Sequence, residues 1–135
     1  MIYTRIMAVE FNHCDPAGIV FYPRYFEMTN SLVENFFADV MGHSYGAMMA
    51  AGHGVPTARL ETNFKLPSRL GDKLEWGLKV ARLGGSSVNF AAMAQLGDQL
   101  RLTADLTLVW VDGGKPTRWP DDMRAKFKAF QGDHK

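Results

Sequence analysis

A short stretch near the N-terminus, HCDPAGIVFYPRYF, brings together three side chains that could carry out chemistry. It holds an imidazole at His13, a thiol at Cys14 and a carboxylate at Asp15, followed at once by a Pro-x-Gly turn. A carboxylate can serve as a nucleophile or as a general base, but an exposed aspartate is only a weak base at neutral pH. Any catalytic role for Asp15 therefore depends on the groups that surround it.

The segment after Asp15 is predicted to enter a helix around Tyr22. From Pro23 onward apolar residues recur every three to four positions as far as Met41, and Gly42 is typical of a helix end. The first N–H groups of a helix lack partners within it and carry partial positive charge. These N–H groups could polarise a carbonyl and stabilise the oxyanion that forms when the carbonyl is attacked.

The same side chains also have structural interpretations. An aspartate before Pro and Gly is most often a turn former, and spacing alone favours that role for Asp15. His13 is more often a hydrogen-bond partner than a metal ligand, since no HxxxH or Cys/His cluster accompanies it. Cys14 and His13 should point to opposite sides of an extended segment, so we expect a small buried thiol and no Cys-His pair. Glu61 is the alternative candidate for a catalytic carboxylate. It lies on the polar face of a predicted strand, and its position is explained equally by a solvated surface residue.

Composition and charge limit the class of protein. The chain has 135 residues, of which 47% are hydrophobic, so we expect one domain over residues 1–135 with a core of its own. The chain has fifteen basic and fourteen acidic residues. This near balance predicts no broad positively charged surface that would bind nucleic acid or an anionic membrane. The single cysteine fits a reducing compartment and predicts a cytoplasmic protein. No leader-like or membrane-spanning apolar run is present.

Hydrophobic periodicity predicts a strand, a long helix, four more strands and a tail helix. The predicted strands cover residues 2–11, 55–67, 73–80, 86–96 and 99–111, a short helical piece covers residues 43–51, and the tail helix lies within residues 113–130. Turns at Gly84-Gly85 and Gly97-Asp98 favour an antiparallel meander of the last four strands. Asp121 and Asp122 suit the first turn of the tail helix.

The second predicted strand alternates clearly between polar and mostly apolar positions. Its apolar side, which we expect to be buried, consists of Ala58, Leu60, Thr62, Phe64 and Leu66. With one sheet and one long apolar helix, the expected class is α+β, with the helix packed across the sheet.

The run DPAGIVFYPRYF, from Asp15 to Phe26, resembles the signature of the 4-hydroxybenzoyl-CoA thioesterase family of hotdog-fold enzymes. The order of predicted elements agrees with that family over nearly the whole chain. The resemblance implies a curved antiparallel sheet of about five strands wrapped around one long central helix. It also implies homodimers, often assembled into homotetramers, with the active site at a subunit interface.

The resemblance assigns roles to residues of this run. Asp15 would be the catalytic carboxylate, which either attacks the thioester carbonyl to give a mixed anhydride or activates water, while the backbone N–H of Tyr22 polarises that carbonyl. Gly18 and Ile19 would form the turn that brings these groups together. Phe21 would border the acyl pocket with Tyr22, unless both are simply core aromatics that anchor the helix.

Two positions depart from the best-known member that acts on an aromatic acyl group. Phe21 replaces a tryptophan, which leaves the pocket size open. His13, which we count with Gly18, Ile19 and Phe21 among the expected substrate-binding residues, replaces an acid, which alters the charge beside Asp15. The turn ARLGGSS also lacks the basic cluster that in this member meets coenzyme A. The candidate substitutes are Arg82, Lys115 and Arg118, although such residues are more often solvated charges.

The leading hypothesis is a cytoplasmic acyl-CoA thioesterase that releases a carboxylic acid and coenzyme A without metal or other cofactor. An aromatic or short acyl group is expected. Two alternatives stay open: a non-catalytic acyl-CoA or acyl-carrier binding module with the same fold, and, with less support from the motif, a hydratase or dehydratase acting on an acyl thioester.

Overall fold

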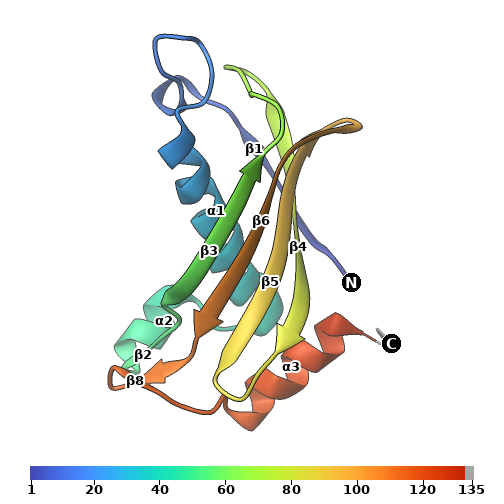
Figure 1. The fold of residues 1–135 in the computed structure, drawn as a ribbon. Coiled ribbons are helices and arrows are strands. Elements are labelled where there is room, and N and C mark those ends of the chain that lie inside the picture. The colour runs from blue at the N-terminus through green and yellow to red at the C-terminus, as the bar shows by residue number, and fades with distance from the viewer. Residues whose placement is uncertain (133–135) are drawn as a thin grey trace.

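A five-stranded antiparallel sheet curves around one long helix in the computed structural model, which describes residues 1–132 (Figure 1). The long helix is α1, Tyr22–Phe36, and a π-helical turn, η2, Phe37–Met41, continues it. The other elements are β1 (Tyr3–Ala8), the 3-10 helix η1 (Phe11–His13), α2 (Tyr45–Ala50), β2 (His53–Gly54), β3 (Thr57–Phe64), β4 (Lys73–Leu83), β5 (Ser87–Leu96), β6 (Gln99–Val109), β7 (Val111–Asp112), β8 (Lys115–Pro116) and α3 (Asp121–Gln131). The α+β class and the hotdog architecture are thereby confirmed.

The strand order in the main sheet is β1-β4-β5-β6-β3. The strands β4, β5 and β6 follow one another through tight turns, as predicted, and Gly97 adopts a φ of 60° in the second of them. The predicted four-strand meander is wrong for β3, which pairs with β6 at the edge, with Leu60 opposite Leu106. Residues 65–72 therefore connect one edge strand to the strand beside the other edge.

The apolar face predicted for the long helix forms the centre of the core. Leu32, Phe36 and Phe37 are fully buried, and Phe36 packs edge-on against Phe90 of β5 with ring centroids 5.3 Å apart. Gly42 follows η2 with a φ of 71°, the left-handed conformation that closes a helix. Alternate side chains of β4, β5 and β6 point inward and form the opposite wall of this core.

The predicted burial of one side of β3 is wrong. Leu60 is 40% exposed and Phe64 is 49% exposed, and only Thr62 of this strand is half-buried. The reason is topological, because β3 has a neighbour on one side only and α1 packs mainly beneath β1 and β4. Edge strands of this kind leave backbone groups and apolar side chains without partners.

Several element boundaries can be compared with the predictions. β1 ends at Ala8, three residues early, because its pairing with β4 ends there and Phe11 turns outward into η1. The short helical piece is confirmed as α2, with the Ser44 hydroxyl accepting a hydrogen bond from the Ala47 N–H at 3.1 Å. The tail helix is confirmed as α3. No helix among residues 1–132 is long and apolar enough to span a membrane.

Candidate functional site

Asp15 lies in a small hairpin between β1 and α1. The N–H of Asp15 donates to the Ile19 carbonyl at 3.0 Å, the Gly18 N–H donates to the Asp15 carbonyl at 2.9 Å, and Gly18 has a φ of 81°. Cys14 and Val20 form a bridge that closes the hairpin. Gly18 and Ile19 thus shape the turn, as expected, and glycine is the residue that accepts this backbone conformation.

The carboxylate of Asp15 is partly engaged by its own turn. Its Oδ1 accepts a hydrogen bond from the Ala17 N–H at 2.9 Å, which is the turn-forming role of an aspartate in this position. Among the described residues no other group donates to this half-buried carboxylate. Its second oxygen is therefore available to a substrate or a water molecule.

One hydrogen bond ties the Asp15 hairpin to the start of α1. The Phe21 N–H donates to the His13 carbonyl at 2.9 Å. This bond joins the residue before Tyr22 to the residue two positions before Asp15. Pro23 has no N–H, and within residues 1–132 the N–H of Tyr22 has no acceptor. The sequence predicts that the Asp15 carboxylate and an unpaired N–H at the helix start lie close together. The two backbone segments that carry these groups are joined by this hydrogen bond.

His13 and Cys14 hold this segment in place. The Nδ1 atom of His13 accepts a hydrogen bond from the Glu10 N–H at 2.8 Å and thereby caps η1. The Sγ atom of Cys14 lies 3.7 Å from the Glu10 carbonyl, and the thiol is half-buried. The interpretation of His13 as a hydrogen-bond partner is confirmed. Among residues 1–132 no group of three potential ligands could hold a metal ion.

The Asp15 hairpin rests on residues 65–72, the segment that leads from β3 to β4. The Val20 N–H donates to the Ser68 carbonyl at 2.9 Å, and Ile19 forms a bridge with Arg69. Arg101 of β6, which is 7% exposed, holds this segment from below. Its Nη1 atom donates to the Pro67 carbonyl at 2.9 Å and to Ser68 Oγ and Asp72 Oδ2 at 3.0 Å each. A buried arginine with several acceptors fixes the geometry of the segment that it binds.

Arg101 was missed by the sequence analysis, because strand alternation places it among ordinary polar positions of β6. The backbone N–H of Arg69 and, after it, the Arg101 guanidinium hold the pKa of Asp72 below its ordinary value. Asp72 also accepts the Arg69 N–H at 2.9 Å through Oδ2. One ionised carboxylate therefore joins the supporting segment to the sheet.

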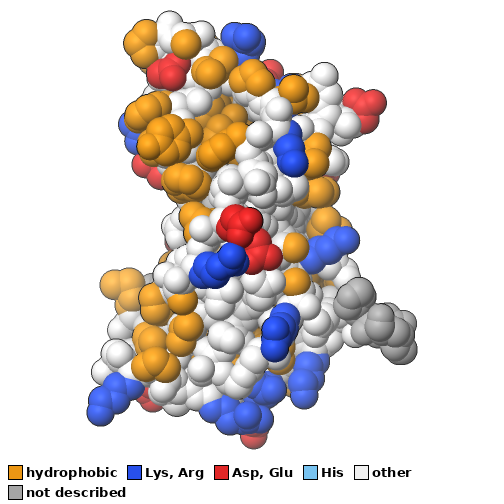
Figure 2. Space-filling model, viewed as in Figure 1, with side chains coloured by type: hydrophobic (Ala, Val, Ile, Leu, Met, Phe, Trp, Pro, Cys, Tyr) orange, Lys and Arg blue, Asp and Glu red, His pale blue; other side chains and the backbone are white. Residues whose placement is uncertain are grey.

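An apolar pocket of about 260 Å³ lies beside the helix start. It is lined by Ile19, Val20, Tyr22, Tyr25, Phe64, Lys65, Leu66 and Pro67. Tyr22 is 58% exposed, and its ring packs edge-on against Phe21 and Phe64. Figure 2 shows hydrophobic side chains gathered on this end of the molecule, at the upper left. The interpretation of Phe21 and Tyr22 as core aromatics is therefore wrong, because both rings face the surface.

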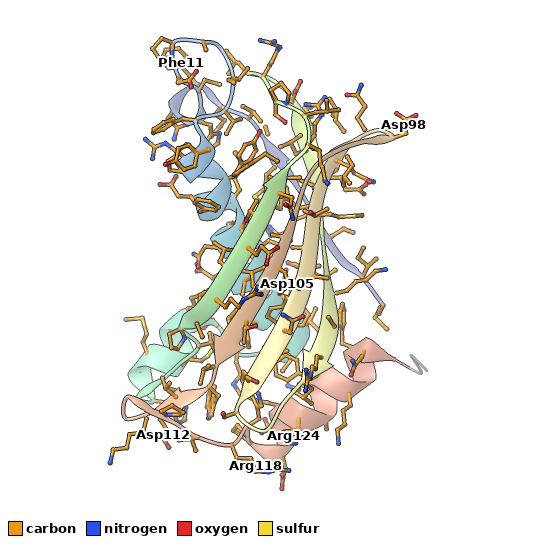
Figure 3. The ribbon with its side chains drawn as sticks, in the orientation of Figure 1. Phe11, Asp98, Asp105, Asp112, Arg118 and Arg124 are labelled. Carbon is orange, nitrogen blue, oxygen red and sulfur yellow. The ribbon has the colours of Figure 1, made fainter. Side chains whose placement is uncertain are left out.

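The basic residues suggested for coenzyme A lie far from this pocket. Arg82 is near the end of β4 that leads into the β4–β5 turn, and Lys115 and Arg118 belong to β8 and the segment before α3. Figure 3 shows Arg118 at one end of the molecule and Phe11, at the start of η1, at the other. Within one chain these residues do not meet Asp15.

The carboxylate of Glu61 forms an ion pair with Arg59. Its carboxylate lies 2.7 Å from Arg59, which also lies 3.5 Å from Asp105 on the neighbouring strand. Figure 3 shows Asp105 near the middle of the molecule. This arrangement confirms the interpretation of Glu61 as a solvated surface residue.

Comparison with solved structures shows the same fold in proteins of low sequence identity. A 1,4-dihydroxy-2-naphthoyl-CoA thioesterase from Synechocystis is 17% identical, with a TM-score of 0.86 over 94% of this chain and 96% of that one. A gentisyl-coenzyme A thioesterase is 21% identical, with a TM-score of 0.87 over 93% and 100%. A Staphylococcus aureus protein solved in complex with CoA is 13% identical, with a TM-score of 0.90 over 97% and 84%.

A sequence-family comparison goes further than the shared fold. The description of the matching family is the thioesterase-like superfamily, and the match covers residues 9–127. It begins just after β1, includes the Asp15 hairpin and all of α1, and ends within α3. Because this match spans most of the chain, the protein belongs to the thioesterase-like superfamily and is a thioester hydrolase with the hotdog fold.

Proposed function

We propose that the protein is an acyl-CoA thioesterase that acts on an aromatic, 4-hydroxybenzoyl-like, or short acyl group in the cytoplasm. The observation that carries this proposal is the hydrogen bond between the Phe21 N–H and the His13 carbonyl, which joins the loop that carries the Asp15 carboxylate to the start of α1, where the Tyr22 N–H has no acceptor among residues 1–132. Two fold relatives are thioesterases of aromatic acyl-CoA compounds, and another was solved with CoA. These likenesses support the substrate class.

In the proposed reaction the thioester carbonyl oxygen accepts a hydrogen bond from the Tyr22 N–H. The Asp15 carboxylate attacks the carbonyl carbon, the C–S bond breaks, and coenzyme A leaves as the thiolate, which gives a mixed anhydride that water then hydrolyses. In the alternative route Asp15 removes a proton from water, and the resulting hydroxide attacks the same carbon. Both routes release the carboxylic acid and coenzyme A.

The proposed active unit is a homodimer that assembles further into a homotetramer. The unpaired edge of β3, with Leu60 and Phe64 exposed beside it, supports pairing with a second copy. The basic candidates for binding coenzyme A lie at the end of the molecule away from Asp15 (Figure 3): Arg82, Lys115 and Arg118. If they bind coenzyme A at this site, they do so from a neighbouring subunit.

A binding module that lacks turnover is the second candidate. The hydrogen bond from the Ala17 N–H to Asp15 favours it, since that bond gives the aspartate a purely structural use. Asparagine can accept the same hydrogen bond, so Asp15→Asn keeps the turn and removes only the carboxylate. This variant separates the two functions.

The test is release of free coenzyme A thiol from benzoyl-CoA, 4-hydroxybenzoyl-CoA and acetyl-CoA by the wild type and Asp15→Asn. For a catalytic carboxylate, kcat of the variant falls by about a thousandfold while the melting temperature and acyl-CoA binding are kept. Equal rates in the two proteins would remove Asp15 from the mechanism. Binding of all three compounds without release by the wild type would establish the binding module.

A further inference from the structure

His13 joins the two ends of the loop that carries Asp15. Its Nδ1 atom accepts a hydrogen bond from the Glu10 N–H at 2.8 Å, and its own N–H donates to the Glu10 carbonyl at 3.0 Å. The His13 carbonyl accepts the N–H of Phe21 at 2.9 Å, and Phe21 directly precedes Tyr22. One residue therefore connects the segment before η1 to the start of α1 across the Asp15 hairpin.

The hydrogen bond at Nδ1 requires a neutral imidazole. A ring nitrogen that carries a proton cannot accept a hydrogen bond, so the neutral ring of His13 holds its proton on Nε2. Protonation of Nδ1 would set the N–H groups of His13 and Glu10 against each other. Histidine side chains change charge between about pH 5 and 8, whereas aspartate side chains generally stay ionised down to about pH 4. Loss of this bond near pH 6 can therefore be distinguished from the titration of a carboxylate.

The surroundings of the imidazole allow it to become charged. His13 lines a polar hollow of about 330 Å³ between β1 and α1. The other titratable residues that line it are Glu10 and Glu27, and the Glu27 carboxylate lies 3.0 Å from the Arg24 guanidinium. The residues that β1 contributes are uncharged, and the thiol of Cys14 is directed at the Glu10 carbonyl. Acid can therefore protonate the half-buried ring beside carboxylates and solvent, without burying a charge.

We propose that His13 is a positioning residue: its neutral imidazole holds the Asp15 loop in place for turnover, and its protonation in mild acid releases the loop and lowers activity. The inference rests on the proposed thioesterase function and adds a pH-dependent control to the same site. No contact between the ring and the substrate is needed. A displaced His13 also displaces the carbonyl that holds the Phe21 N–H, and with it the start of α1 relative to Asp15.

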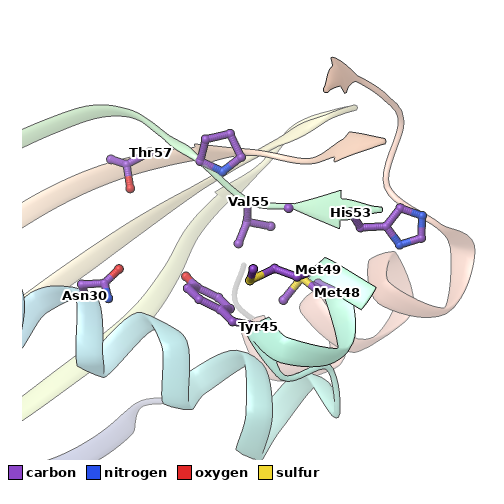
Figure 4. Close-up of a pocket in the computed structure, with 9 residues that line it drawn as sticks. Asn30, Tyr45, Met48, Met49, His53, Val55 and Thr57 are labelled. Carbon is purple, nitrogen blue, oxygen red and sulfur yellow. The ribbon is translucent and has the colours of Figure 1, made fainter. Parts of the chain in front are cut away.

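Two other histidines provide internal controls. The Nε2 atom of His43 lies 3.4 Å from Asp122 of α3, and that of His53 lies 3.6 Å from Asp112 of β7. His53 lines the pocket of Tyr45, an apolar pocket of about 340 Å³ between α1, α2 and the start of β3, and Figure 4 shows it at one side of this pocket. Among the described residues, no hydrogen bond or ion pair joins either ring to η1 or to the start of α1.

The first test is the pH profile of kcat/KM for benzoyl-CoA. Between about pH 7.5 and pH 5.5 the wild type should lose about tenfold, as expected for one histidine that must be neutral. His13→Asn places an oxygen that cannot be protonated near the position of Nδ1, so this variant should lose less than about twofold over the same range. His43→Asn should keep the wild-type profile. An acid limb that persists in His13→Asn, or that His43→Asn abolishes, would overturn the inference.

The second test separates positioning from a general loss of activity. His13→Leu leaves the Glu10 N–H without its acceptor, and at about pH 8 its kcat for benzoyl-CoA should fall by about tenfold while KM changes by less than about twofold. His13→Asn should recover most of this loss, because it restores the acceptor. Equal rates in the wild type and His13→Leu, or equal losses in the two variants, would contradict the positioning role.

Hydrogen exchange tests the inference without a substrate. In the wild type the protection factors of the Glu10 and Phe21 N–H groups should fall together between about pH 7.5 and pH 5.5, and in His13→Asn they should change by less than about twofold. The control is the Ala47 N–H, which donates to the Ser44 hydroxyl in another part of the chain. Protection at Glu10 and Phe21 that is independent of pH would overturn the inference.

This last measurement separates the inference from the proposed function. If the wild type hydrolyses no acyl-CoA, the proposed function fails, while the exchange of the Glu10 and Phe21 amides still decides the role of His13. If the wild type is active and depends on Asp15, but its acid limb is the same in His13→Asn, the proposed function stands and His13 does not control the loop.

Discussion

The guanidinium of Arg101 lies 3.0 Å from the carboxylate of Asp72 and fixes the segment on which the Asp15 hairpin rests. The same guanidinium donates to the Ser68 hydroxyl, while the Ser68 carbonyl accepts the Val20 N–H of the hairpin. The proposed catalytic loop is therefore supported by an ion pair between the buried Arg101 and the half-buried Asp72. Arg101 also donates to the carbonyl of Pro67, which lines the pocket beside Tyr22.

Loss of this support should affect both stability and turnover. Arg101→Met removes the guanidinium donor from Asp72, which keeps only the Arg69 N–H, and from the oxygens of Pro67 and Ser68. We expect the free energy of unfolding in urea to fall by about 2 kcal/mol. We also expect kcat to fall, because the segment that supports the Asp15 hairpin is displaced. The control is Arg59→Met, which removes exposed ion pairs and should cost less than about 0.5 kcal/mol. Equal effects of the two substitutions would contradict the supporting role.

The lowered pKa of Asp72 predicts a pH dependence of stability. A carboxyl whose folded-state pKa is depressed contributes stability that is present above the unfolded pKa of about 3.9 and is lost as the pH falls through the folded value. The wild type should therefore exceed Asp72→Asn in urea stability at pH 7, and the difference should narrow below about pH 4. A difference that stays constant down to pH 3 would show that the charge of Asp72 is not involved.

The left-handed conformation of Gly18 should be required for the Asp15 turn. Gly18 has a φ of 81°, and a Cβ atom there would meet nothing within 4 Å, so Gly18→Ala tests backbone strain alone. We expect a loss of about 1–2 kcal/mol in unfolding free energy and a lower kcat. Gly46→Ala is the matched control, since Gly46 lies in α2 with equal space and an ordinary φ, and alanine there should stabilise the helix. An unperturbed Gly18→Ala enzyme would argue against the role of this turn.

The free edge of β3 should carry the dimer contact. Replacement of Leu60 and Phe64 by lysine puts charged side chains at the exposed apolar positions of this edge and should convert dimers into 15.1 kDa monomers in sedimentation experiments. Ile6→Lys on β1, the opposite edge of the sheet, is the control and should leave the dimer unchanged. If the lysine variant of β3 remains dimeric, the subunits pair through another surface.

Local patterns were sufficient for much of the fold. The three-to-four spacing from Pro23 to Met41 and the glycine at position 42 predict the long helix, because helix periodicity and the left-handed end depend on neighbouring residues. The turn around Gly97 and the alternation of β4 to β6 follow in the same way. The placement of Asp15 just ahead of the helix is likewise a property of the sequence itself.

The tertiary structure decided which strand lies at the edge and what surrounds the proposed site. Alternation in β3 cannot reveal that its neighbour is β6, so Leu60 and Phe64 were expected inside and lie outside. Arg101 looks like any polar residue of a strand until the segment of residues 65–72 folds over it. The pocket of Tyr45 joins three segments that are distant in sequence. Such long-range contacts depend on the packing of the whole chain, whereas the sequence alone determined the helix, the turns and the acid before the helix start.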